Sequence, residues 1–297
     1  MGLFDGLSAF PPTPADAQGH VQEKLLAALI GRIAATEADS VGLLGSTGGY
    51  AYLTPSERQR AVRVAVECLG GKRPLFVGVG ALRTDDAQAL AMDARKAGAD
   101  GLLVAPMSYT PLTEEEVFQH VVAVAEAGEL PLCIYNNPGT TKFTFSEDLI
   151  ARLAKVPHIV AVKMPLPADG GFAGELVRLR VRLPQDFTIG YSGDWGAADA
   201  LLAGCDAWFS VIAGLLPAPA VALMRAAQAR NEAEVRRIDT RFRPLWALFQ
   251  EFGSFRVMYA VADSLGLYNL APPRPILPLS GEARTRVEAA LKALGAS

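Results

Sequence analysis

The sequence predicts an α/β fold, a (β/α)8 barrel with a C-terminal helical appendage, from two observations. First, eight short apolar runs alternate with longer helix-like stretches over roughly the first 220 residues. Most runs are apolar throughout, which is typical of parallel strands covered on both faces. Second, the alternation stops after the eighth run, and helical patterns alone follow. We therefore expect a barrel domain over residues 1–220 and a helical region over residues 221–297.

The expected strands are short and rich in β-branched and aromatic residues. They cover residues 7–10, 41–45, 75–80, 101–105, 132–135, 159–163, 187–192 and 207–211. The last one opens an uncharged stretch, 207–224, that imitates a membrane span. Because Gly214, Pro217 and Pro219 interrupt this stretch, a strand, a loop and a helix start explain it better. We therefore expect no contact with a membrane.

The helices between these strands have recognisable starts. Thr54 is expected to cap one helix, with Pro55 in its first position and Glu57 completing a capping box. Further helices are expected to open at Thr84, Thr113 and Ser146. These boundaries place a helix after each of several strands, as a barrel requires.

Composition limits the classes of function. The 297 residues carry a net charge of −3, which gives no electrostatic reason to expect nucleic-acid binding. The three cysteines are far apart and form no CxxC pair, so we expect reduced, buried thiols. The N-terminus lacks a basic segment followed by a long apolar one, so we expect a cytoplasmic protein. No HExxH motif or carboxylate cluster suggests a metal site.

A glycine-rich turn follows the second expected strand. Ser46 and Thr47 lie between Gly45 and the pair Gly48–Gly49, where small residues let backbone amides point at a ligand. The hydroxyl groups add hydrogen-bond donors, so the turn suits a carboxylate or a phosphate. Taken alone, it is equally consistent with an ordinary glycine turn.

Two other strand ends carry chemically useful side chains. Tyr135 ends the fifth expected strand and can move a proton or orient a substrate, although alone it also fits a rim aromatic. Lys163 ends the sixth, and period-2 alternation places it on one face with Ile159 and Ala161. If the valines of this strand face the helices, Lys163 points into the barrel. The alternative is a lysine that extends to solvent.

Together the three strand ends suit one chemistry, because active sites of such barrels lie at the C-terminal ends of the strands. An amine enclosed by apolar groups has a lowered pKa and can attack a ketone to form a Schiff base. The turn would bind the carboxylate of a 2-oxo acid, and the lysine would condense with its ketone. The resulting iminium withdraws electrons, so the neighbouring carbon can lose a proton and form or break a carbon–carbon bond.

These segments resemble the dihydrodipicolinate synthase / N-acetylneuraminate lyase family of class I aldolases over essentially the whole chain. "GLLGSTGG" matches the family's G-[ST]-T-G-E turn, "YNNP" its Y-N-x-P motif and "IVAVK" the strand carrying its Schiff-base lysine. "YSGDW" and "GCDAWFSVIAGLLP" resemble two further elements. The resemblance implies a small-molecule 2-oxo acid substrate such as pyruvate, no cofactor beyond the covalent lysine imine, and a homotetramer built as a dimer of dimers.

The resemblance also implies roles for individual residues. Lys163 would be the Schiff-base nucleophile and Tyr135 the proton relay. The carboxylate would be bound in the turn, and other positions would surround the rest of the substrate. The implied binding residues are Ser46, Thr47, Gly48, Thr140, Gly193, Asp194 and Ser210, with Thr47 also placed among the catalytic residues.

The sequence departs from the family pattern where the second substrate binds. Thr140 occupies the position of the arginine that holds the carboxylate of the synthase's aldehyde substrate. Ser108 falls where the family has a tyrosine donated across the dimer interface, and Tyr109 follows as a candidate catalytic substitute. Gly49 replaces a glutamate, and Met164 replaces the acidic or polar residue often found after the lysine.

Three hypotheses follow. The main one is a Schiff-base aldolase or lyase that acts on pyruvate and other 2-oxo acids, including 2-keto-3-deoxy sugar acids. The alternative is dihydrodipicolinate synthase activity, with the missing arginine compensated elsewhere. The third, from another class, is a non-catalytic 2-oxo acid sensor.

Overall fold

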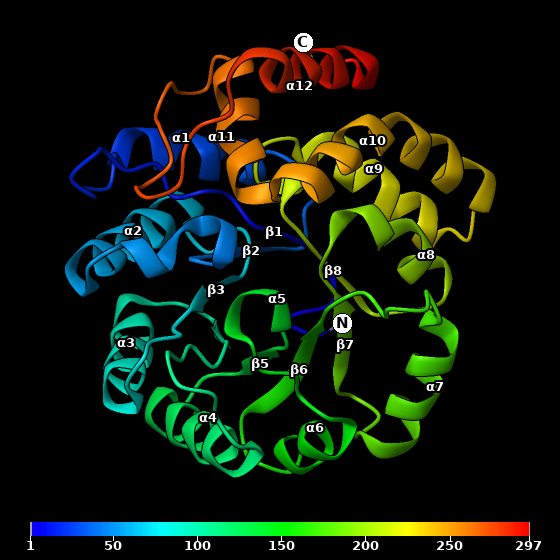
Figure 1. Cartoon of the computed structure of the whole chain (residues 1–297). Coiled ribbons are helices and arrows are strands. Elements are labelled where there is room, and N and C mark those ends of the chain that lie inside the picture. The colour runs from blue at the N-terminus through cyan, green and yellow to red at the C-terminus, as the bar shows by residue number, and fades with distance from the viewer. Residues whose placement is uncertain (1, 297) are drawn as a thin grey trace.

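The computed structural model describes residues 2–296, in which parallel strands close into a barrel in sequence order, β1 to β8 (Figure 1). Each strand overlaps one of the expected apolar runs, so the predicted (β/α)8 barrel is confirmed. The strands are β1 (Gly6–Ala9), β2 (Ser40–Leu43), β3 (Leu75–Gly78), β4 (Gly101–Val104), β5 (Leu132–Tyr135), β6 (Ile159–Met164), β7 (Thr188–Tyr191) and β8 (Ala207–Ser210).

Helices cover the outside of the barrel, and most follow a strand directly (Figure 1). They are α1 (Glu23–Ala34), α2 (Pro55–Leu69), α3 (Thr84–Ala97), α4 (Glu114–Gly128), the short α5 (Pro138–Thr141), α6 (Glu147–Leu153), α7 (Phe172–Arg182), α8 (Ala197–Leu202) and α9 (Pro217–Gln228). The uncharged stretch 207–224 thus divides into β8, a single 3-10 turn and the start of α9. Within residues 2–296, no helix is both long and apolar enough to span a membrane.

The predicted C-terminal helices are α10 (Glu232–Phe252), α11 (Ser254–Ser264) and α12 (Gly281–Leu294). Figure 1 shows them together on one side of the barrel. α11 contacts the 3-10 turn Ser46–Gly48, and α10 contacts the 3-10 turn Asp194–Gly196. The appendage therefore lies against two loops at the C-terminal ends of the strands. A division at residue 220 would cut through α9.

One of the predicted helix starts is wrong in detail. The Thr54 side chain accepts the backbone N–H of Glu57 as predicted, but the Glu57 carboxylate accepts the backbone N–H of Val21 at 2.7 Å instead of closing a capping box. The helix predicted to open at Thr84 does begin there, and the Thr84 hydroxyl pairs with His120 Nδ1 at 3.0 Å. The caps at Thr113 and Ser146 are confirmed.

Aromatic rings fill the barrel interior. Phe76 makes edge-to-face contacts with Phe4, with ring centroids 5.0 Å apart, and with Phe10, at 5.5 Å. Phe209 packs against Phe10 and Phe76 from β8. Outward-facing residues of the strands belong instead to the larger core shared with the helices. The barrel interior is therefore filled by packed apolar side chains, and these form the floor of its C-terminal mouth.

A β-bulge near the start of β6 changes which residues face inward. Leu132 pairs with Ile159, but the next residue, Cys133, pairs with Ala161, so Val160 is skipped and its side chain is 38% exposed. Ile159 lies in the outer core, and the prediction that it shares a face with Lys163 is wrong. Beyond the bulge the alternation holds: Val162 packs outward and Ala161 faces the barrel interior.

Candidate active site

A cavity of about 560 Å³ opens at the C-terminal ends of the strands. Its size suits a small metabolite. Segments from across the sequence line it: the loops after β2, β5, β6, β7 and β8, and α10 and α11. Of the site residues predicted from sequence, seven line this cavity: Ser46, Thr47, Tyr135, Thr140, Lys163, Gly193 and Asp194.

Lys163 lies at the inner end of this cavity, enclosed by aromatic rings. Its Nζ is 3.8 Å from the ring centroid of Phe10, 4.3 Å from that of Tyr135 and 5.6 Å from that of Phe209. The side chain is 2% exposed, and within residues 2–296 no carboxylate forms an ion pair with it. Burial lowers the pKa of Lys163 from 10.5 to about 7, because the charged form loses its hydration. The amine is therefore partly neutral at physiological pH and can act as a nucleophile.

The space for these rings depends on two glycines of the "GLLG" segment. A Cβ atom at Gly42 would lie 2.4 Å from the Phe10 ring, and one at Gly45 would lie 2.7 Å from it. Larger residues at either position would displace Phe10 from beneath Lys163. These two glycines of the turn motif therefore shape the surroundings of the lysine rather than contact a substrate.

The lowered pKa of Lys163 predicts the pH dependence of its reaction with a ketone. Only the neutral amine attacks, so the second-order rate of imine formation is expected to rise with pH through about pH 7 and then level off. The rate of borohydride-trapped adduct formation from pH 5.5 to 9 measures this directly. A rate that still rises about tenfold per pH unit up to pH 9, as for a solvated lysine with a pKa near 10.4, would contradict the burial argument.

Tyr135 lies beside Lys163 and connects it to the turn after β2. The Tyr135 hydroxyl and the Ser46 hydroxyl are 3.3 Å apart. Burial raises the pKa of Tyr135 to about 12, with the Ser46 hydrogen bond opposing the shift. The phenol is therefore protonated at neutral pH and can donate a proton and then recover it. A hydroxyl pair next to an amine is an arrangement suited to proton transfer.

The turn after β2 forms a short 3-10 helix, Ser46–Gly48, at the mouth of the barrel. The side chains of Ser46 and Thr47 line the cavity that contains Lys163. Gly48 instead lines a smaller, neighbouring cavity with Thr13 and Gly49. The hydroxyls that could bind a carboxylate thus come from the first two residues of the turn.

Asp194 is held by hydrogen bonds within the protein, whereas the sequence resemblance implied a role in substrate binding. Its carboxylate is 1% exposed and accepts hydrogen bonds from Trp208 Nε1 at 2.9 Å and from the backbone N–H groups of Val211, at 3.2 Å, and Ile212, at 2.7 Å. Burial raises its pKa to about 6, although these donors favour the charged form. Asp194 therefore fixes the loop after β8. Ser210 is fully buried outside the cavity lining, and its hydroxyl accepts the backbone N–H of Ala213 at 3.1 Å.

The predicted replacement for the interface tyrosine lies away from the cavity of its own chain. The side chain of Tyr109 is 98% exposed on the loop after β4. Several other lining residues, mostly apolar, could not be predicted from the sequence motifs, because they come from loops that are distant in sequence. These are Asn137, Pro165, Leu166, Trp195, Val211, Phe249 and Ser254.

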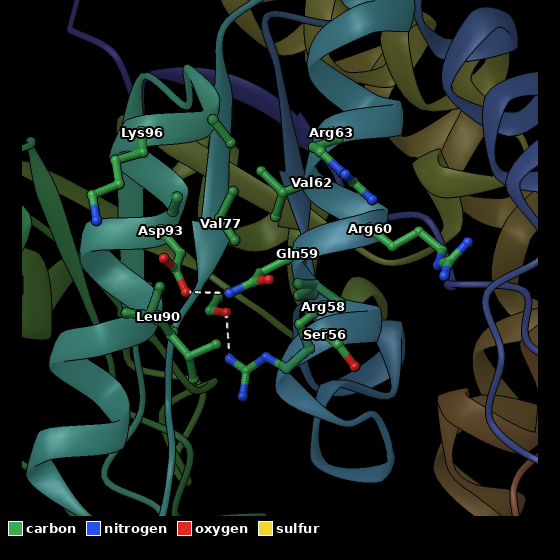
Figure 2. Close-up of a pocket in the computed structure, with 15 residues that line it drawn as sticks. Ser56, Arg58, Gln59, Arg60, Val62, Arg63, Val77, Leu90, Asp93 and Lys96 are labelled. Carbon is green, nitrogen blue, oxygen red and sulfur yellow. Dashed lines mark hydrogen bonds between the residues drawn. The ribbon is translucent and has the colours of Figure 1, made fainter.

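A second cavity, of about 390 Å³, lies between α2 and α3 on the outside of the barrel. Figure 2 shows it between the two helices, with Arg58 pointing into it and Gln59 hydrogen-bonded to Asp93. Arg58 donates to the carbonyl oxygens of Gly78 at 2.8 Å and Gly80 at 3.0 Å. These hydrogen bonds hold the backbone at the end of β3 in place. None of the site residues predicted from the sequence lines this cavity.

Comparisons with known proteins identify the family to which this barrel and its buried lysine belong. Residues 3–294 match the Dihydrodipicolinate synthetase family. The chain is 32% identical over 286 residues to the 4-hydroxy-tetrahydrodipicolinate synthase of Alcanivorax borkumensis, covering 95% of each chain. It is 34% identical over 287 residues to the enzyme of that name from Azoarcus sp., covering 95% of this chain and 96% of the relative.

A solved structure is more similar still. The crystal structure of a dihydrodipicolinate synthase from Agrobacterium tumefaciens shares 62% identity and superposes with a TM-score of 0.97 over 98% of both chains. Family, sequence relatives and solved structure all agree with the resemblance drawn from the motifs. The chain therefore belongs to the dihydrodipicolinate synthetase family and is a lyase of the lysine Schiff-base class.

Proposed function

We propose that this chain condenses pyruvate with Lys163 and then joins the bound pyruvate to an aldehyde, or reverses that reaction. The observation that carries the proposal is the buried, partly neutral amine of Lys163 at the inner end of the cavity, next to the Tyr135 hydroxyl. Ser46 and Thr47, which line the same cavity, would bind the pyruvate carboxylate through their hydroxyls. The iminium itself withdraws electrons, so the proposal requires neither a metal nor an organic cofactor.

The proposed reaction has four steps. The lone pair of Lys163 Nζ attacks the C2 carbonyl carbon of pyruvate. The carbonyl oxygen takes one proton from the amine and one from the Tyr135 hydroxyl and leaves as water, which gives an iminium. A proton leaves C3, and the electron pair neutralises the iminium to give an enamine. C3 of the enamine then bonds to the aldehyde carbon, whose oxygen gains a proton. Water hydrolyses the new iminium and regenerates the amine. Tyr135 is placed to move these protons.

The names of the relatives favour 4-hydroxy-tetrahydrodipicolinate synthesis as the first candidate for the complete reaction. They support this alternative better than the more general aldolase hypothesis drawn from the sequence. A dipicolinate carries two carboxylates, one of which pyruvate supplies. The aldehyde partner must supply the other, so this activity requires an aldehyde such as aspartate 4-semialdehyde.

A second candidate is cleavage or dehydration of another 2-oxo acid, including a 2-keto-3-deoxy sugar acid. The observation that favours it is Thr140, which lines the cavity at the position where the synthase motif has an arginine. The third hypothesis, a non-catalytic sensor, does not fit a chain that is a member of a lyase family.

Paired assays separate the two candidates. One measures aldehyde-dependent consumption of pyruvate with aspartate 4-semialdehyde, and the other measures pyruvate release from 2-keto-3-deoxygluconate. A kcat/KM at least about tenfold higher with the semialdehyde would support the synthase, since tenfold corresponds to about 1.4 kcal/mol in the transition state. A faster release from the sugar acid would overturn the synthase assignment in favour of the lyase.

Tyr135→Phe is expected to lower kcat by a factor of about 10² to 10⁴, the range for loss of a positioned proton-transfer group. The ring that encloses Lys163 remains, whereas the hydroxyl paired with Ser46 is lost. Steady-state kinetics and an unfolding midpoint measured on the same preparation check the prediction. Unchanged kcat in a folded variant would remove Tyr135 from the proton path.

We also propose a homotetramer and a cytoplasmic location for the protein. The support is membership of the family, for which the sequence resemblance implies a dimer of dimers, and the position of Tyr109. Its ring is almost completely exposed on the loop after β4, where it is available to a second copy of the chain. In that assembly Tyr109 would contribute its hydroxyl to the site of a neighbouring subunit.

A further inference from the structure

Ser192 lines the same cavity as Lys163 and Tyr135, at the end of β7. In the paired strands, Tyr135 lies beside Lys163, and Lys163 lies beside Gly190. Tyr191 packs outward into the core shared with the helices. Because successive side chains alternate between the two faces of a strand, Ser192 points to the same inner face as Gly190. Its hydroxyl therefore lies one layer above Lys163, towards the opening of the cavity.

Two groups of Ser192 donate to a single carbonyl oxygen. The backbone N–H donates to the carbonyl oxygen of Met164 at 2.8 Å, and the side-chain hydroxyl donates to the same oxygen at 3.0 Å. The backbone hydrogen bond alone satisfies this carbonyl group. A hydroxyl group rotates about its C–O bond to reach the best acceptor. The Ser192 hydroxyl can therefore turn to another acceptor without leaving the Met164 carbonyl unpaired.

The Tyr135 hydroxyl is such an acceptor. Burial raises the pKa of the Tyr135 phenol to about 12, and hydrogen bonding with Ser46 and with Ser192 opposes this shift. Both hydroxyls therefore favour the phenolate over the phenol. Ser46 approaches from the turn after β2, with its oxygen 3.3 Å from the phenol oxygen, and Ser192 approaches from the end of β7. The phenol oxygen thus has a hydroxyl group from each of two loops.

The phenolate is the species in the proposed reaction that most needs such donors. Tyr135 gives its proton to the departing carbonyl oxygen of pyruvate, and the anion that remains is buried. The phenolate becomes neutral again when it takes the proton from C3 of the bound pyruvate. Hydrogen bonds to a charged group are about twice as strong as those between neutral groups. A second hydroxyl donor therefore stabilises this anion between the two proton transfers.

We propose that Ser192 is a positioning residue for the proton transfers of Tyr135. Its hydroxyl donates to the Met164 carbonyl oxygen in the resting protein and turns to the Tyr135 oxygen while that oxygen is negatively charged. Ser192 keeps its own proton, and Tyr135 remains the group that gives and takes protons. The inference rests on the proposed Lys163 chemistry and adds a residue to it. It applies to both candidate reactions, because both pass through the pyruvate enamine.

Exchange of the C3 hydrogens of pyruvate in D2O tests this step without a second substrate. The exchange passes through the enamine, and proton NMR of the methyl signal measures its rate. Ser192→Ala is expected to lower this rate by a factor of about 10 to 100, the range for one hydrogen bond to a charged group. The final yield of borohydride-trapped adduct at saturating pyruvate should not change. Ser192→Thr keeps the hydroxyl and should restore the rate.

The same substitution in a Tyr135→Phe background shows whether Ser192 acts through Tyr135. Without the phenol hydroxyl, Ser192→Ala should cause no further loss of exchange. An equal loss in both backgrounds would overturn the proposal, because it would mean that Ser192 only holds the end of β6. Thr240→Ala is the matched control. Its hydroxyl donates to the Arg236 carbonyl oxygen at 2.7 Å outside the cavity, so this variant should exchange at the wild-type rate.

Adduct formation on the same preparations separates failure of the inference from failure of the proposed function. If the adduct forms on Lys163 and Ser192→Ala exchanges as fast as wild type, the role of Ser192 is overturned and the pyruvate chemistry stands. Exchange in Ser192→Thr as slow as in Ser192→Ala would also overturn it. If wild-type protein forms no adduct on Lys163, the proposed function fails, and the role of Ser192 fails with it.

Discussion

Lys163→Met is expected to abolish covalent capture of pyruvate and to lower kcat/KM by a factor on the order of 10⁶, as for removal of other catalytic nucleophiles. The thioether fills the space between the Phe10 and Tyr135 rings but has no lone pair of comparable nucleophilicity. No other amine lines the cavity within the described residues, so no neighbour can take over the reaction. Pyruvate-dependent turnover in steady state measures the loss.

Lys155→Met is the matched control for this substitution. Lys155 is exposed outside the cavity, so its replacement should leave turnover and adduct formation at wild-type levels. Turnover within tenfold of wild type in a folded Lys163→Met protein would reject imine catalysis at this residue.

The same Lys163→Met substitution is expected to stabilise the fold at neutral and acidic pH. The pKa of Lys163 falls from 10.5 to about 7 on folding, so the unfolded chain binds more protons between these pH values. The stability of the wild type therefore rises with pH across this window and carries the full penalty below about pH 7. A shift of this size corresponds to about 5 kcal/mol in the free energy of unfolding. Methionine avoids that penalty.

Urea unfolding of wild type and variant at pH 6, 8 and 10 measures this difference. The variant should have the higher free energy of unfolding at pH 6, and the gap should close towards pH 10. Asp194, whose pKa is raised to about 6, is present in both proteins and largely cancels in the comparison. A gap that is constant with pH would show that packing, rather than the buried amine, separates the two proteins.

The sequence was sufficient to predict the barrel because its strands are covered on both faces and appear as continuous apolar runs. It also located Lys163, Tyr135 and the turn at Ser46, since each directly follows or ends such a run. The alternation of β6 was predicted only in part. The bulge that skips Val160 depends on the pairing with β5, and the pattern of one strand does not contain that information.

The remaining features of the site depend on contacts between distant segments. Phe10 is 153 residues from Lys163 in sequence and reaches it only when β1 closes the barrel. The placement of Leu166 requires the glycines at 193 and 196, and the role of Asp194 requires Trp208. The predicted capping box at Thr54 and Glu57 was wrong for the same reason, since the Glu57 carboxylate accepts the backbone N–H of the distant Val21.

The proposed function depends most directly on one step, the formation of an imine between Lys163 and pyruvate. Wild-type protein is incubated with pyruvate, reduced with borohydride, digested and analysed by mass spectrometry. We expect one pyruvate-derived adduct per chain, located on Lys163, and none when pyruvate is omitted. An unmodified Lys163, or an adduct on another lysine, would contradict imine formation at Lys163.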